Sequence, residues 1–242
     1  GTQRNMLYRP QPRHLPAAQD ELRLNFNGNL LQISHRAPSA PVSNATAGTK
    51  PPALIYFGGN AEDVSTQLKR FARIWPQREL YLVHYRGWGA SGGKPSEPSL
   101  MADALAVFDH VKATHAEVAV IGRSLGSGVA VQVASQRPVS QLVLVTPYDS
   151  IAKVAREQMP FWVPVDWLLK DRWESAQFAP NVSAPTTLIQ AEHDTTIAAD
   201  RTASLLKAFA PGVATLHHLG DVDHNSILFS RDYHRLLAEA IS

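Results

Sequence analysis

The sequence of 242 residues contains no cysteine, which excludes disulfides, thiolate catalysis and thiolate metal sites. No run of about 18 or more apolar residues occurs, so no segment has the pattern of a membrane-spanning helix. The numbering starts at Gly1, and we therefore expect a processed or truncated product, from which a signal or anchor upstream of Gly1 could have been removed. Membrane association is expected only through such a segment. With such a segment removed, we expect a periplasmic or membrane-anchored protein. Without one, we expect a cytoplasmic protein.

The chain also has little net charge, with 23 basic against 21 acidic residues. Without a basic stripe carrying interleaved aromatic residues, we expect no nucleic-acid partner. Apolar residues make up 44% and charged residues 18% of the chain, as in proteins with a buried core. The length fits one α/β domain over residues 1–242, and we expect a monomer.

One turn organises the chain, and it is formed by residues 121–128, Ile-Gly-Arg-Ser-Leu-Gly-Ser-Gly. An apolar strand arrives at it and a helix of small residues leaves it. In the pattern Gly-x-Ser-x-Gly, glycines two residues before and after Ser124 avoid the collision that a Cβ would cause. The turn would lift the Ser124 hydroxyl above the sheet and place the Leu125 N–H where it can donate to an oxyanion. The same pattern also occurs for packing alone, so the rest of the chain must supply a base, an acid and a second donor.

Before this turn the chain predicts an irregular segment, a hairpin and a loop. Residues 1–20 are rich in Pro, Arg and Gln, and we expect them to lie over the surface. Asn27-Gly28 between two apolar runs predicts an antiparallel hairpin with a type I′ turn. Residues 36–52 are rich in Pro, Ala, Ser and Thr, which predicts a long exposed loop.

Strands and helices then alternate, which predicts a mostly parallel sheet with helices on both faces. Continuous apolar runs fit strands that are covered on both sides. The expected strands are residues 21–26, 29–35, 53–57, 80–85, 118–121, 142–145, 187–190 and 214–219. The expected helices include residues 61–74, 100–111, 199–209 and 226–241.

Residues 150–185 form an insertion that is too long for a simple crossover. It carries three of the five tryptophans of the chain. Either a helix there caps the sheet and buries its aromatic side chains, or the insertion is a small helical lid with an apolar pocket over Ser124. We favour the lid, with Phe161, Trp162 and Trp167 as substrate-binding residues.

An activated serine needs a base, and an acid that orients this base. We favour His224 as the base, because it lies in the loop after the last strand. The rival histidines are His84, His193, His217 and His218. Asp194 follows the preceding strand and gives the chain order Ser, Asp, His, which favours it as the acid. Asp149 is its main rival, although its neighbour Ser150 suggests a helix cap.

The second oxyanion donor should come from residues 56–63, Tyr-Phe-Gly-Gly-Asn-Ala-Glu-Asp, at the end of a strand. We expect the Asn60 N–H in this role, although the glycines could serve only a tight turn. The glycine-rich residues 85–93 lack a phosphate-binding pattern, so no nucleotide cofactor is expected. His, Asp and Glu residues near 192–194 and 217–224 lack an established metal-ligand spacing, so no metal is expected.

With these residues in place, the chain resembles the α/β-hydrolase superfamily from about residue 21 to its end. It is most similar to single-domain serine hydrolases with a His-Gly-Asn-Ala loop, a Tyr-Arg-Gly-Tyr-Gly-x-Ser-x-Gly loop and the sequence Gly-Arg-Ser-Leu-Gly, here residues 58–61, 85–93 and 122–126. The resemblance implies Ser124, Asp194 and His224 as the triad and the N–H groups of Asn60 and Leu125 as oxyanion donors. The chain departs from the motifs of these hydrolases at Gly58, where they have histidine, and at Trp88, where they have tyrosine.

The residues and the resemblance together predict a hydrolase of carboxylic esters or acyl thioesters with apolar acyl groups, acting on a small-molecule substrate without a cofactor. Relatives of this type include membrane-anchored lipid and acyl-thioester hydrolases. The same triad could serve a peptidase or amidase. A binding module that has kept the fold and lost the chemistry is the alternative from another class.

Overall fold

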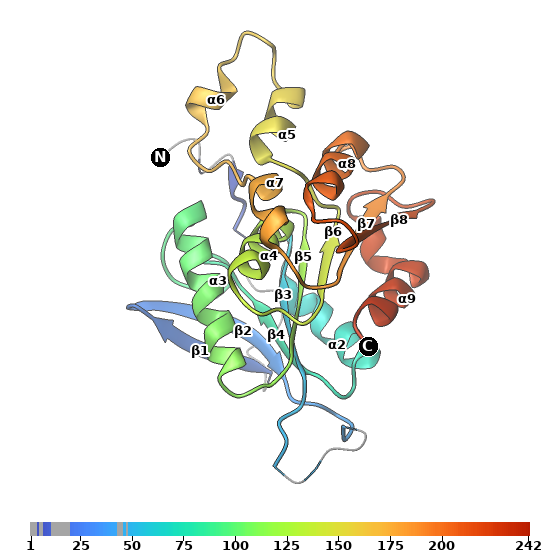
Figure 1. Ribbon diagram of the computed structural model, residues 1–242. Helices are drawn as coiled ribbons and strands as arrows, with labels where there is room; N and C mark the ends of the chain where they lie inside the picture. Colours follow the sequence, from blue (N-terminus) through green and yellow to red (C-terminus); the bar gives the residue numbers. More distant parts are fainter. Residues whose placement is uncertain (1–3, 5–6, 11–19, 43–45, 47) are drawn as a thin grey trace.

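The computed structural model describes residues 4, 7–10, 20–42, 46 and 48–242, without the side chains of Trp167 and Leu168. The described residues form an eight-stranded sheet in the order β1-β2-β4-β3-β5-β6-β7-β8 (Figure 1). The strands are β1 (Glu21–Phe26), β2 (Asn29–Arg36), β3 (Ala53–Phe57), β4 (Glu79–Val83), β5 (Val118–Arg123), β6 (Leu142–Val145), β7 (Thr186–Ala191) and β8 (Ala214–Leu219).

Helices fill the connections between the strands. The helices are η1 (Val64–Gln67), α2 (Leu68–Ile74), α3 (Glu97–Lys112), α4 (Leu125–Gln136), α5 (Ile151–Gln158), α6 (Val165–Leu168), α7 (Ser175–Phe178), η2 (Ala179–Asn181), α8 (Ala199–Ala208), η3 (Ser226–Phe229) and α9 (Arg231–Ala240). The single helix expected over residues 226–241 is interrupted at Ser230, whose side chain caps α9 by accepting from the Tyr233 N–H. None of the helices in the described part of the chain has the length and apolar character needed to cross a bilayer.

The predicted hairpin is confirmed. β1 and β2 pair antiparallel around Asn27 and Gly28, whose φ angles of 51° and 79° are those of a type I′ turn. β2 also runs antiparallel to β4. From β4 through β3 to β8 every pairing is parallel. The sheet is therefore mostly parallel with an antiparallel N-terminal hairpin, as expected.

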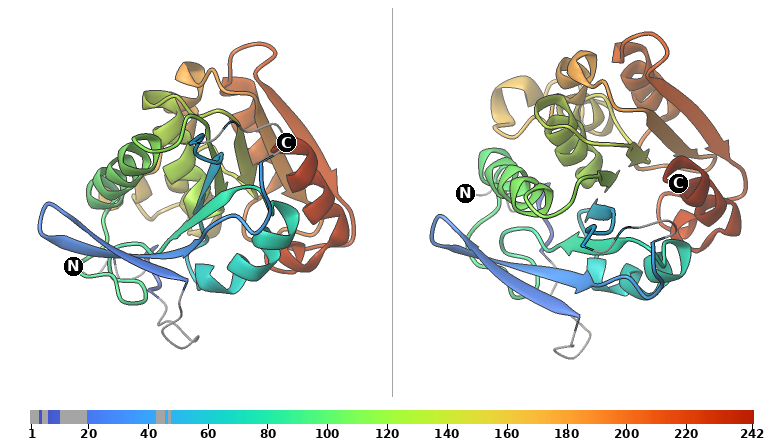
Figure 2. Two further views of the ribbon diagram at one scale, coloured as in Figure 1. Left: turned by 90° about the horizontal axis from the view of Figure 1, so that it is seen from below. Right: turned by 60° about the horizontal axis from the view of Figure 1, so that its bottom comes forward.

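Both faces of the sheet are buried along its central strands β4, β3, β5 and β6, and alternate residues of one strand supply two separate cores. On β3, Ile55 and Phe57 pack with residues of α3 and α4. Leu54 and Tyr56 pack with residues of α2 and α9 on the opposite face. Figure 2 shows helices on both sides of the sheet. Side chains on a strand alternate between its faces, so a continuous apolar run is what a strand covered on both sides requires. This explains why the central strands β3, β5 and β6 are mostly apolar, whereas the last strand, β8, carries polar, exposed residues.

One expectation about a peripheral segment needs correction. Tyr8 is only 2% exposed and its ring packs edge-on against Trp88, so the N-terminal segment does not simply lie over the surface. Trp173, from the insertion, is fully buried. The described parts of the loop 36–52 are exposed or half-buried as expected, and residues 43–45 and 47 of that loop lie outside the described residues.

Candidate active site

The turn at Ser124 joins β5 to α4 with the strained geometry that its sequence predicts. Ser124 has φ 51° and ψ −116°, in the left-handed region that is costly for a residue with a side chain. A Cβ at residue 122 would lie 2.2 Å from the carbonyl oxygen of Gly126, and one at residue 126 would lie 2.0 Å from that of Phe57. Both glycines are therefore required by close approach, and the start of α4 packs directly against the end of β3.

His224 lies within hydrogen-bond distance of the serine. Its Nε2 is 2.9 Å from Ser124 Oγ, and the histidine occupies the loop between β8 and η3. Asp223 shapes this loop, because its Oδ1 accepts from the N–H groups of Asn225 at 2.9 Å and Ser226 at 2.7 Å. These N–H groups, that of Ser226 first, lower the pKa of Asp223 below its ordinary value. A charged Asp223 thus stabilises the turn that presents the imidazole.

Asp194 approaches the imidazole from the other side. Its Oδ2 is 2.9 Å from Nδ1 of His224, while its Oδ1 accepts from the backbone N–H groups of Thr196 and Ile197 at 2.9 and 2.8 Å. A carboxylate that faces Nδ1 makes this nitrogen the donor and leaves Nε2 to accept the serine proton. The structure brings Ser124, His224 and Asp194 together in this order, although 100 residues separate the serine from the histidine.

The rival residues have other partners. Asp149 is fully buried and forms ion pairs with Arg201 at 3.1 Å and with Lys153 at 3.4 Å. Its neighbour Ser150 caps α5. The buried His84 contacts Ser34 Oγ through Nε2 at 2.9 Å. His217 and His218 are both exposed on β8.

The loop with the second expected oxyanion donor follows β3 and touches the start of α4. A Cβ at residue 126 would also lie 2.7 Å from the Gly58 carbonyl oxygen. Leu125 is the first residue of α4, where a helix leaves N–H groups without partners of its own. The Asn60 carbonyl oxygen accepts from Trp88 Nε1 at 3.2 Å. This arrangement places the loop of Asn60 against the turn of Ser124.

The N-terminal segment contributes to this loop in a way the sequence did not indicate. The side chain of Asn60 accepts from the Arg9 N–H at 2.7 Å and donates to the Leu7 carbonyl oxygen. Nearby, the Tyr8 hydroxyl donates to Asp171 at 2.9 Å and accepts from Trp173 Nε1 at 3.2 Å. Residues 7–9 therefore link the Asn60 loop to the insertion. No periodicity or motif in a proline-rich segment could have indicated a contact across 51 residues.

The insertion carries its outward-facing apolar side chains between α5 and α6. Phe161 and Trp162 are 92% and 72% exposed, and the Trp167 side chain lies outside the described residues. Gln158 Nε2 at the end of α5 donates to the Thr196 carbonyl oxygen at 3.1 Å. This contact connects the insertion to the loop of Asp194.

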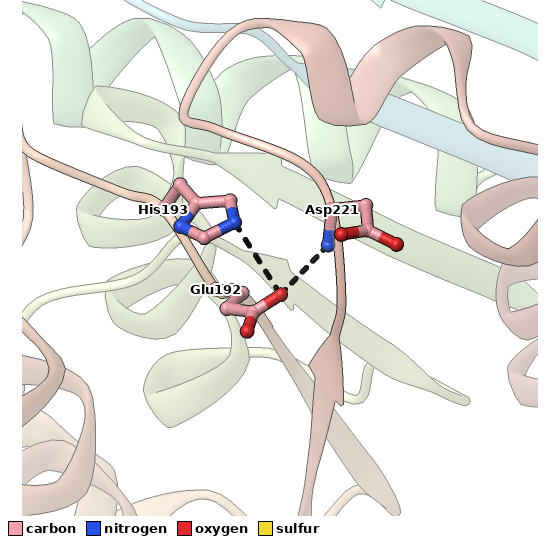
Figure 3. A group of neighbouring side chains, drawn as sticks. All are labelled: Glu192, His193 and Asp221. Atoms are coloured by element: carbon pink, nitrogen blue, oxygen red, sulfur yellow. Dashed lines mark hydrogen bonds and ion pairs between the residues drawn. The ribbon is translucent and has the colours of Figure 1, made fainter.

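Three exposed side chains of the types that bind metal ions lie beside the loops of Asp194 and His224. Glu192 Oε2 accepts from the Asp221 N–H at 2.8 Å and lies 3.5 Å from His193 Nε2 (Figure 3). Potential ligand atoms of these three residues lie within 4.8 Å of one another. The hydrogen bond from Asp221 to Glu192 ties the loop of Asp194 to the loop of His224.

Comparisons with known proteins agree with the architecture. No protein-family model matches the chain. An uncharacterized protein of Mycobacterium tuberculosis is 35% identical over 170 residues, which are 68% of this chain and 60% of that protein. The lysophosphatidylserine lipase ABHD12 of Xenopus tropicalis is 32% identical over 173 residues, 62% of this chain and 44% of that protein. The chain thus spans about half the length of the curated relatives it matches.

Solved structures resemble nearly the whole chain. Est1E from Butyrivibrio proteoclasticus with bound ferulic acid has a TM-score of 0.70 at 14% identity, over 91% of this chain and 99% of that structure. The Pyrococcus furiosus esterase Pf2001 has a TM-score of 0.70 at 16% identity, over 96% and 98%. The sheet order, the turn at Ser124 and these similarities show that the chain has the α/β-hydrolase fold.

Proposed function

We propose that the chain is a serine hydrolase that cleaves carboxylic esters or acyl thioesters through an acyl-enzyme intermediate. One observation carries the proposal, namely the hydrogen-bonded series Ser124–His224–Asp194 with 2.9 Å at each contact. A nucleophile in contact with a base, and a base oriented by a third group, are the elements of triad catalysis. The turn at Ser124 and the loop of Asn60 add two backbone N–H groups to this series.

The reaction would follow from these positions. As Ser124 Oγ bonds to the acyl carbon, its proton passes to His224 Nε2, and the N–H groups of Asn60 and Leu125 stabilise the oxyanion. Breaking the acyl bond releases an alcohol or thiol, which takes the proton from His224. A water molecule then gives a proton to His224 and attacks the acyl-enzyme. The acid leaves and the proton returns to Ser124.

The substrate is proposed to carry an apolar acyl group. Residues 159–165 of the insertion contain no charged side chain, and the exposed Phe161 and Trp162 would supply apolar contact area to such a group. Similarity to a protein named as a lysophosphatidylserine lipase and to esterase structures supports this substrate class. Trp167 is proposed as a third contact.

A fluorophosphonate probe tests the nucleophile. We expect labelling of the wild type, none of Ser124→Ala, and unchanged labelling of Ser135→Ala, whose hydroxyl lies on α4 and donates to Gln132. A panel of esters, thioesters and amides with matched acyl groups then separates an esterase from a peptidase or amidase. Folded wild-type protein that is not labelled would refute the proposal and favour a binding module.

A further inference from the structure

Arg123, the residue before Ser124, connects three segments of the site with one side chain. Its Nη1 donates to Glu62 Oε1 at 2.8 Å. Its Nη2 donates to the backbone carbonyl oxygen of His224 at 2.9 Å and to Asn225 Oδ1 at 3.0 Å. The side chains of Arg123 and Glu62 are each only 5% exposed. A single guanidinium thus joins the end of β5 to the loop after β3 and to the loop of His224.

Glu62 extends these contacts to the loop of Asn60. Its Oε1 also accepts from the Gly59 N–H at 2.9 Å, and its Oε2 accepts from the Tyr56 hydroxyl at 2.7 Å. The loop lies directly against Arg123, because a Cβ at residue 59 would be 2.7 Å from Arg123 Nη1. The position of the expected oxyanion donor therefore depends on the same ion pair as the position of the base.

The electrostatics of the pair agree with its contacts. Burial alone would lower the pKa of Arg123, but the neighbouring Glu62 raises it above its ordinary value. Burial and Glu62 together raise the pKa of Tyr56 well above its ordinary value. A buried ion pair repays the removal of its charges from water only with good geometry and further hydrogen bonds. Apolar residues of similar volume would often stabilise a fold equally well, so stability alone does not explain the pair.

We propose that Arg123 and Glu62 are positioning residues that fix the His224 loop and the Asn60 loop relative to Ser124. This inference rests on the proposed function. The planar guanidinium suits the task because its fork of donors can hold a carboxylate and a carbonyl oxygen at once. A displacement of about 1 Å at a reacting group can cost about 100-fold in rate, and the pair would prevent such a displacement of His224 against Ser124.

The test compares Arg123→Lys with Arg78→Lys. The two arginines are equally buried, at 4% exposure. Arg78 lies just before the amino end of β4, whereas Ser124 follows the carboxyl end of β5. Arg78 donates to the carbonyl oxygens of Ala53 and Ser242. Lysine keeps the charge in both variants, but a compact ammonium cannot reproduce the fork. Melting temperatures measure the structural effect of each substitution.

Turnover of a soluble short-chain ester and hydrogen exchange of the amides in residues 220–226 measure positioning. For Arg123→Lys we expect kcat to fall about 100-fold, KM to stay within about twofold, and exchange in residues 220–226 to accelerate. Arg78→Lys should change none of these, even with a comparable loss of melting temperature. If Arg123→Lys does not fold, Glu62→Gln, which keeps the shape and loses the charge, takes its place.

The outcomes separate the two proposals. Unchanged kcat and exchange in Arg123→Lys, or an equal fall of kcat in Arg78→Lys, would overturn the positioning role. If Ser124 of the wild type does not react with a fluorophosphonate, the proposed function fails. In that case the exchange comparison still decides whether Arg123 fixes the His224 loop.

Discussion

The carboxylate of Asp194 lies 2.9 Å from Nδ1 of His224, on the side of the imidazole opposite Ser124. Two backbone N–H groups of its own loop hold this carboxylate in place. The side chain of Asp194 is only 2% exposed and that of His224 only 12%. Water therefore competes little for this hydrogen bond, and the tautomer of His224 is set by Asp194.

Replacing Asp194 with Asn should remove this control. The amide can donate to Nδ1 and so favour the wrong tautomer, and we expect kcat to fall about 10⁴-fold with little change in folding. Steady-state kinetics on a soluble ester measure the effect. Asp149→Asn is the matched control, because it alters a buried carboxylate paired with Arg201 and should reduce stability rather than kcat. A larger fall of kcat in the control would reverse the assignment of the acid.

Gly126→Ala should damage the turn at Ser124. The added Cβ would meet the backbone of Phe57 at 2.0 Å, and backbone cannot move aside as a flexible side chain can. We expect a loss of about 1–3 kcal/mol in the free energy of unfolding together with slower fluorophosphonate labelling. Urea denaturation and labelling rates provide the measurements. In Gly220→Ala the new Cβ would meet Glu192 at an ordinary 3.4 Å, so both quantities should stay near the wild type.

Phe161→Ala and Trp162→Ala should separate binding from stability. Both side chains are exposed, so the free energy of unfolding should change by no more than about 0.5 kcal/mol. If they contact an apolar acyl group, KM should rise for long-chain esters and stay constant for acetyl esters. A chain-length series with each variant measures this. Equal effects on short and long acyl groups would show that these side chains do not contact the acyl chain.

Asp223→Ala should remove the pH dependence that Asp223 gives to the stability of the His224 turn. Because the folded-state pKa of Asp223 is lowered, the stabilisation is present above the unfolded-state pKa of about 4 and is lost as the pH falls through the folded-state pKa. Urea denaturation should therefore show a difference between wild type and variant near neutral pH that shrinks below about pH 4. A difference that persists in acid would mean that charge on Asp223 does not stabilise the turn.

The absence of a side chain at residue 58 has a local explanation. A Cβ there would lie 2.5 Å from Cγ1 of Val64, which is buried in the core around α2. The Gly58 carbonyl oxygen accepts from the Tyr85 hydroxyl at 2.6 Å. The loop that contains Gly58 therefore leaves no space for a side chain at this position. The hydrogen bond from Tyr85 holds the backbone of the loop instead.

Local patterns in the sequence determined most of the fold. The turn at Asn27-Gly28 follows from two residues that tolerate positive φ, and the glycines at 122 and 126 follow from close backbone approach. Apolar runs placed the central strands β3, β5 and β6 to within about two residues, because burial on both faces leaves little room for polar positions. These features depend on neighbours in the chain, so the sequence carries them directly.

Tertiary structure decided how distant residues meet. Asp149 and Asp194 both follow strands of the same sheet, and only the folded chain shows that one faces Arg201 and the other His224. The contact of Asn60 with residues 7–9 and the bonds of Arg123 to Glu62 and the His224 loop have no sequence signature. Hydrogen bonds between residues 51 to 101 positions apart depend on the final packing of loops, which no local propensity specifies.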